Sequence, residues 1–192
     1  SACSPSRASI LSARYPHRTQ AEELHWPIPE EIPLFVDHLR ERGYWTGSAG
    51  KWHLGDAMLE RFDRVFQTDT SGFQLPSGAT EADATFRETL EGDARSGCAD
   101  WVPLLQSRPD ARPFFVWLAA LDPHRPYDQE AARHTHAPDA VRLPPYHPDT
   151  PIVRQDYLAY YEEIHRLDRF VGSTLAELER QQVAENTLIL FL

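Results

Sequence analysis

The chain has 192 residues, of which 41% are hydrophobic and 11% aromatic, a composition that allows one globular domain with a core of its own. Its formal net charge of -10 excludes nucleic acid as a general partner, and no run approaches the roughly 18 to 20 apolar residues that a membrane span requires. Because Met58 is the only methionine and no signal-peptide pattern opens the chain, we expect a fragment or a processed product.

The first half of the chain predicts a helix, a short strand and a surface excursion. Residues 31–42 place apolar side chains three and four positions apart and end at Gly43, so we predict an amphipathic helix capped by glycine. An extended segment at 44–49 follows it. Residues 69–100 are rich in Thr, Ser, Gly, Glu and Asp, which predicts a long excursion outside the core.

The second half predicts two strands and a long helix. The apolar run 114–121 lies between prolines and is typical of a buried parallel strand. Residues 131–150 carry prolines and histidines without periodicity and predict a loop, whereas 157–178 predict a helix of about seven turns. Residues 188–192 form another apolar run of strand type. The alternation predicts an α/β fold with a mainly parallel sheet flanked by helices, and functional sites in such sheets form at the carboxyl ends of strands.

The first candidate site residues stand at the start of the chain, where residues 3–14 read CSPSRASILSAR. A thiol at Cys3, followed by Pro5 and Arg7 and leading into an apolar stretch, indicates a nucleophile near a helix start. Amide groups and a guanidinium can stabilise an oxyanion there. The alternatives are a buried structural thiol and, in an oxidising compartment, a disulfide with Cys98.

The second candidate segment is residues 43–55, GYWTGSAGKWHLG. Lys51 is the only lysine of the chain and stands two residues before His53. In an extended segment both side chains point to the same side while Trp52 packs the other way, so Lys51 and His53 can converge on one anion. A point charge and a titratable donor suit an anionic oxygen and a reacting hydroxyl, although exposed Lys and His are more often simply solvated.

The third candidate is His124, in a loop that directly follows the run 114–121. Its position after a predicted strand favours a functional role over an incidental histidine in a turn. His134, His136 and His147 lie in the next loop, but their spacing fits no closed zinc ligand set, so we expect surface histidines there.

Together these motifs resemble the type I sulfatase family. Residues 43–55 are similar to its signature GYxTxxxGKWHLG, and residues 121–127 are similar to its DPHxPY loop. Residues 143–151 and the helix after them are more weakly similar to the branch that contains heparan N-sulfatase. Ala13 stands where the other signature, CxPSRxxxLxGR, usually has glycine, which bears on how efficiently the cysteine is converted. The positions that match this signature are Cys3, Pro5, Ser6, Arg7, Leu11 and Arg14.

The resemblance implies a mechanism and a role for each site residue. A separate maturation enzyme would oxidise Cys3 to formylglycine, whose hydrate carries two hydroxyls. One hydroxyl would attack sulfur and expel the alcohol or amine, and the second, deprotonated with the help of His53, would release sulfate. Arg7 would steady the hydrate, while Lys51 and His124 would hold sulfate oxygens.

The resemblance also implies a calcium ion, with the oxygen derived from Cys3 as one metal ligand. Calcium takes six or more oxygen ligands, and we expect the others outside this chain, on a strand before Cys3 and in a segment after Leu192. Residues 1–192 are therefore expected to form a partial sulfatase catalytic domain of the alkaline phosphatase superfamily, incomplete and inactive alone.

The function implied is hydrolysis of a sulfate ester or sulfamate, with a sulfated small molecule or glycan, preferably a sugar, as substrate. A periplasmic or extracellular location is implied as well. The first alternative is a phosphonate or phosphate ester hydrolase of the same superfamily. The second is a non-catalytic protein that binds sulfated glycans, although binding alone would not demand an oxidisable cysteine.

Overall fold

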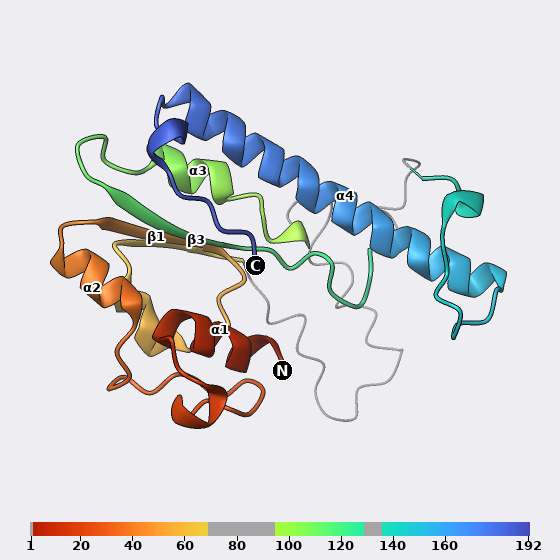
Figure 1. Cartoon of the computed structure of the whole chain (residues 1–192), viewed down its shortest axis with the longest axis horizontal. Coiled ribbons are helices and arrows are strands. Elements are labelled where there is room, and N and C mark those ends of the chain that lie inside the picture. The colour runs from red at the N-terminus through yellow and green to blue at the C-terminus, as the bar shows by residue number, and fades with distance from the viewer. Residues whose placement is uncertain (1, 69–94, 129–135) are drawn as a thin grey trace. The chain divides into compact units, whose positions relative to one another are not determined.

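A computed structural model describes residues 2–68, 95–128 and 136–192 (Figure 1). The chain divides into two compact units. The first comprises Ser1–Asp69 and Pro103–Ala119, and the second comprises Thr70–Val102 and Ala120–Leu192. Within the described residues, no helix is both long and apolar enough to cross a membrane.

The first unit contains a parallel sheet of three strands in the order β2-β1-β3. The central strand β1 (Trp45–Gly50) pairs with β2 (Arg64–Gln67) on one side and with β3 (Phe114–Ala119) on the other. All six residues of β1 are buried, whereas five of the six in β3 are only half-buried. The predicted parallel α/β architecture is thus confirmed, with β3 two residues shorter than the apolar run.

Two α-helices of the first unit, α1 (Cys3–Ser12) and α2 (Phe35–Glu41), lie on one side of the sheet (Figure 1). The prediction placed the start of α2 four residues too early. Pro33 disfavours helical backbone at the residue before it, and the helix begins where the Asp37 carboxylate accepts the N–H of Leu34 at 2.9 Å. Its glycine cap is confirmed, because Gly43 has φ +84° and donates to the Arg40 carbonyl at 2.9 Å.

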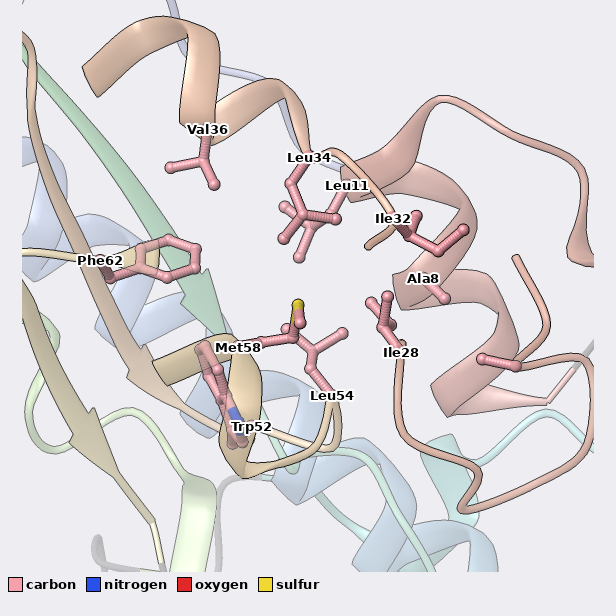
Figure 2. Packing of buried hydrophobic residues seen from close by; sticks show 11 residues of the cluster. Ala8, Leu11, Ile28, Ile32, Leu34, Val36, Trp52, Leu54, Met58 and Phe62 are labelled. Carbon is pink, nitrogen blue, oxygen red and sulfur yellow. The ribbon is translucent and has the colours of Figure 1, made fainter. Parts of the chain in front are cut away.

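Apolar side chains from α1, α2 and the loops after α1 and β1 form the core on this side of the sheet (Figure 2). Phe115 and Trp117 of β3 pack against this core. They stand two positions apart, so their side chains point to the same face of the sheet, which is the face that the core covers. Two short 3₁₀ helices, η1 (Pro16–Arg18) and η2 (Asp56–Arg61), also belong to this unit. The buried cluster consists of Ala8, Leu11, Ala21, Ile28, Ile32, Leu34, Val36, Trp52, Leu54, Met58 and Phe62.

The second unit is organised by the long helix α4 (Pro151–Arg180). It begins six residues before the predicted start, because Thr150 caps it by accepting the Val153 N–H at 3.4 Å and Pro151 suits the first helical position. Two 3₁₀ helices, η6 (Pro138–Ala140) and η7 (Ala184–Asn186), also lie in this unit, whereas the short helix α3 (Trp101–Gln106) begins in it and continues along the chain into the first unit. Residues 136–150 form the predicted loop apart from η6.

Two expectations for this unit were wrong in the described residues. The run 188–192 forms no strand and is exposed, with Leu188 at 84% and Leu192 at 85%, because an apolar run forms a strand only where it finds a ladder partner. A surface excursion was predicted at 69–100, of which residues 69–94 lie outside the described part of the chain. In the described remainder the prediction was wrong, because Ser96 and Cys98 are fully buried. Polar composition misled there: the Ser96 carbonyl accepts two backbone N–H groups, from Leu121 at 2.8 Å and Asp122 at 3.2 Å.

Candidate active site

Cys3 is the first residue of α1, as the sequence predicted for a nucleophile near a helix start. Its side chain is half-buried, and neither Cys3 nor the buried Cys98 forms a disulfide in the structure. The helix start exposes amide groups that carry no intrahelical partner, and these favour negative charge at this position. A nucleophile at Cys3 therefore meets a locally positive backbone environment.

Arg7 lies one turn after Cys3 and on the same face of α1. Its guanidinium donates to the carbonyl of Trp52 at 2.9 Å and to the carbonyl of Lys51, and it lies 5.2 Å from the ring centroid of Trp117. Burial lowers the pKa of Arg7 to about 10, and the nearby Cys3 opposes that shift. Arg7 is thus still a cation at neutral pH, and it fastens the loop after β1 to the helix that carries Cys3.

Lys51 is the first residue beyond β1, at the carboxyl end of a parallel strand. Its backbone N–H donates to the Ala119 carbonyl at 2.9 Å, and the residue is only 9% exposed. Burial lowers the pKa of the Lys51 ammonium, the charge of Arg7 lowers it further, and a hydrogen bond to the Cys3 side chain counteracts both effects. The structure therefore brings Cys3, Arg7 and Lys51 together, with two basic side chains beside the thiol.

His53 departs from the extended geometry that the sequence predicted. Its φ is +55°, a left-handed backbone rare for residues other than glycine, so the alternation argument for Lys51 and His53 does not hold. Trp52 packs into the core as expected and donates from its indole N–H to the Gly55 carbonyl at 2.8 Å. The left-handed turn directs His53 to a partner that the sequence did not indicate.

That partner is His25, in the loop between η1 and α2. Its Nδ1 lies 2.6 Å from Nε2 of His53, and the ring centroids are 4.7 Å apart. The backbone N–H of His25 donates to the Ser4 hydroxyl at 2.8 Å, directly beside Cys3 in sequence. Sequence reasoning missed His25, because it stands in an aperiodic loop and the contact joins residues 28 positions apart.

His124 lies in the second unit, on the loop after β3, and is exposed. Its Nδ1 lies 2.6 Å from the carbonyl oxygen of Arg125. Asp122 and Asp128, on either side of His124 in the sequence, are both held by Arg166 of α4, which binds the Asp122 carboxylate through two hydrogen bonds of 2.7 and 2.8 Å and Asp128 at 2.9 Å. All three charged groups are buried, so these ion pairs hold the backbone on both sides of His124 in place.

The described residues supply no metal centre, either around Cys3 or in the loop that contains His136 and His147. Across residues 2–68, 95–128 and 136–192, no group of three or more His, Cys, Asp or Glu side chains is placed to hold a metal ion. These residues therefore do not fit a calcium shell by themselves. His136 is half-buried and bonded through Nδ1 to the Glu162 carboxylate at 2.9 Å, His147 is exposed, and His134 lies outside the described residues.

Known proteins similar to this chain agree on one family. The family model described as Sulfatase matches residues 1–192. N-sulphoglucosamine sulphohydrolase of Homo sapiens is 28% identical over 222 residues, covering 100% of this chain and 40% of that protein. Choline-sulfatase of Rhizobium meliloti (strain 1021) is 24% identical over 240 residues, covering 98% of this chain and 47% of that protein. The chain thus spans less than half the length of these relatives.

Solved structures share the fold at lower sequence identity. The crystal structure of Ps i-CgsB in complex with k-i-k-neocarrahexaose has a TM-score of 0.62 and 20% identity, covering 94% of this chain and 45% of that chain. A second crystal structure of Ps i-CgsB gives a TM-score of 0.64 at the same identity and coverage. This likeness concerns the backbone arrangement.

Proposed function

Because this chain belongs to the sulfatase family, we propose that it carries part of the active site of a hydrolase that removes sulfate from an ester or sulfamate. The observation that supports this most directly is the position of Cys3 at a helix start beside two basic side chains, the half-buried Arg7 and the buried Lys51. A structural thiol needs neither charge. A group that must stabilise a developing anion benefits from both.

Cys3 fits conversion to formylglycine, since it forms no disulfide and its side chain is only half-buried. When formed, that group supplies an oxygen nucleophile in place of the thiol. Lys51 binds a sulfate oxygen of the substrate, and its burial strengthens this interaction by excluding water. Arg7 contributes positive charge and holds the backbone of Lys51 in place, while His53 accepts or donates a proton at its imidazole. His124 is a proposed sulfate contact on the strength of the DPHxPY resemblance alone.

The substrate we propose is a sulfated sugar, O-sulfated or N-sulfated. The similarity to N-sulphoglucosamine sulphohydrolase, whose name denotes a sulfated amino sugar, supports this class. We propose that calcium is held by oxygen ligands outside the described ranges. A formylglycine-generating enzyme is the proposed maturation partner, and a periplasmic or extracellular location rests on the resemblance alone.

Mass spectrometry of the peptide that carries Cys3 tests the first half of this proposal. The protein containing this chain is produced with and without a formylglycine-generating enzyme. We expect the aldehyde at Cys3 only with the enzyme, and unmodified Cys98 in both samples as the internal control. Finding only the thiol at Cys3 after coexpression would contradict the proposal.

Kinetics of the converted protein test the second half. Lys51→Ala and His53→Ala should each lower turnover of an aryl sulfate by roughly a hundredfold or more, the loss expected for a positioned charge or an acid–base group. His17→Ala is the matched control, because His17 is exposed and stacks on Tyr15. A parallel assay with a phosphonate monoester separates the sulfatase from the alternative hydrolase. Wild-type rates in either site variant would refute the assignment.

A further inference from the structure

We propose that His25 is a positioning residue for His53, holding its imidazole in one orientation and one tautomer. This inference rests on the proposed function for its consequence in catalysis. It begins from the contact itself: Nδ1 of His25 and Nε2 of His53 are 2.6 Å apart. Two imidazole nitrogens at this distance form a hydrogen bond only when one carries the proton and the other offers a lone pair.

This hydrogen bond determines whether Nδ1 of His53 carries a proton. If Nε2 of His53 is the donor, its Nδ1 has the lone pair. If Nε2 is the acceptor, Nδ1 carries the proton. The position of the proton on His25 therefore sets the tautomer of His53, as the partners of functional histidines commonly do. Loss of His25 would release that selection and free the ring to rotate.

The backbone at both histidines is held in the same rare conformation. His53 has φ +55° and His25 has φ +70°, positions that cost non-glycine residues of order 1 kcal/mol or more each. A strained backbone of this kind persists only where the surrounding structure holds it in place, and such positions are concentrated at functional sites. Two left-handed histidines whose rings meet therefore point to a contact maintained for its geometry.

The contact also connects the two segments that carry the candidate site. The His25 backbone donates to the hydroxyl of Ser4, which is the residue after Cys3, while the His25 ring reaches the residue two positions after Lys51. Arg7 makes the same kind of connection through the carbonyls of Lys51 and Trp52. In addition to Arg7, His25 is thus a second connection between α1, which carries Cys3, and the loop after β1.

A shared metal ion is a poorer explanation of the pair. Nitrogens that both bind one zinc ion at about 2.0 to 2.1 Å in tetrahedral geometry lie roughly 3.3 Å apart, wider than the observed 2.6 Å. Within the described part of the chain, no third ligand completes such a site. The hydrogen bond accounts for the distance directly.

Three variants of the full-length protein that contains this chain test the proposal. His25→Phe keeps a ring of similar shape without a polar atom, whereas His25→Asn keeps a hydrogen-bonding atom close to the position of Nδ1. His17→Phe makes the same chemical change at an exposed histidine of the preceding turn. For His25→Phe we expect kcat to fall roughly tenfold or more with KM within about twofold of wild type, and for His25→Asn we expect most of that loss to be recovered.

The tautomer of His53 gives a readout that does not depend on activity. In ¹⁵N spectra of the imidazoles, wild type and His25→Asn should show one dominant His53 tautomer, and His25→Phe should show a mixture. Wild-type kcat together with an unchanged His53 spectrum in His25→Phe would overturn the proposal. So would a rise in KM alone, since it would make His25 a substrate contact. An inactive wild type would count against the proposed function, while the spectra would still decide the role of His25.

Discussion

The two units hold their candidate catalytic loops by different physical means. In the first, the helix that begins at Cys3 is set against the loop after β1 by an apolar core, and Arg7 adds hydrogen bonds to backbone carbonyls. In the second, the loop that presents His124 is fastened to α4 by a buried network in which Arg166 binds Asp122 and Asp128. One attachment rests on apolar burial, the other on paired charges.

This difference predicts different sensitivities. Apolar burial is nearly indifferent to pH and loses stability in proportion to the volume removed. A buried ion network depends on every partner, because one charge left alone has no water to solvate it. Substitutions should therefore lower the free energy of unfolding in different ways in the two units: in proportion to the volume removed in the first, and by breaking charge pairs in the second.

The largest effect is expected where the network loses the arginine that hydrogen-bonds to both Asp122 and Asp128. Arg166→Ala leaves the Asp122 and Asp128 carboxylates buried without their main partner and should lower the free energy of unfolding by about 3 to 5 kcal/mol. Denaturant unfolding measures this, with Arg169→Ala, an exposed arginine of the same helix, as control. A loss below about 1 kcal/mol would show that the network contributes no more than a surface ion pair.

The corresponding test of the first unit removes volume from its core. Leu11 is fully buried in α1 (Figure 2), so Leu11→Ala should lower the free energy of unfolding by about 3 kcal/mol, equally at pH 5 and pH 8. Its neighbour Ile10 is 40% exposed, and Ile10→Ala serves as the control with a much smaller loss. A pH-dependent loss for Leu11→Ala would mean that charge also stabilises this unit.

A third test uses the carboxylate beside the network. Burial raises the pKa of Glu163 from 4.5 to about 7, opposed by the backbone N–H of Asp128, which donates to Glu163 at 2.7 Å. The folded state thus binds the proton more tightly than the unfolded chain. The resulting stability is complete below about pH 4.5 and is lost as pH rises through about 7, a change of up to about 3 kcal/mol.

Glu163→Gln should remove that pH dependence while keeping an acceptor for the Asp128 N–H. Urea unfolding at several pH values between 5 and 8 should show the stability of wild type falling relative to Glu163→Gln as pH rises. Glu179→Gln, an exposed change on the same helix, should leave the wild-type slope intact. Parallel curves for wild type and Glu163→Gln would contradict a buried proton on Glu163.

The fold was largely predictable because its elements carry local signals. The period of α4, the apolar run of β3 and the glycine after α2 each depend on neighbouring residues only. The strand expected at 188–192 failed for the complementary reason: strand formation depends on a partner that composition does not reveal. The burial of Ser96 and Cys98 likewise arises from backbone hydrogen bonds to the distant Leu121 and Asp122.

The residues of the candidate site also fall into those that local sequence predicts and those that it does not. Cys3, Arg7 and Lys51 were found through motifs, and the structure brings these three together. His25 was missed because its contact with His53 depends on two left-handed backbone positions, which no periodicity encodes. Motifs identify residue types at fixed spacing, whereas contacts between loops become visible only in three dimensions.

The smallest expected effect concerns the end of α1, where Ala13 has φ +54° and ψ +32°. Glycine, usual at this position of the family signature, adopts this left-handed conformation without the steric cost of a Cβ. Ala13→Gly should therefore raise the free energy of unfolding by up to about 1 kcal/mol, even though glycine is generally destabilising. Ala176→Gly, an exposed change within α4, should have the opposite sign and a cost of about 1 kcal/mol. Chemical unfolding of both variants measures the contrast. If Ala13→Gly destabilises as Ala176→Gly does, the left-handed end of α1 is not the conformation in solution, and the usual glycine must be explained by the recognition of Cys3 during its conversion.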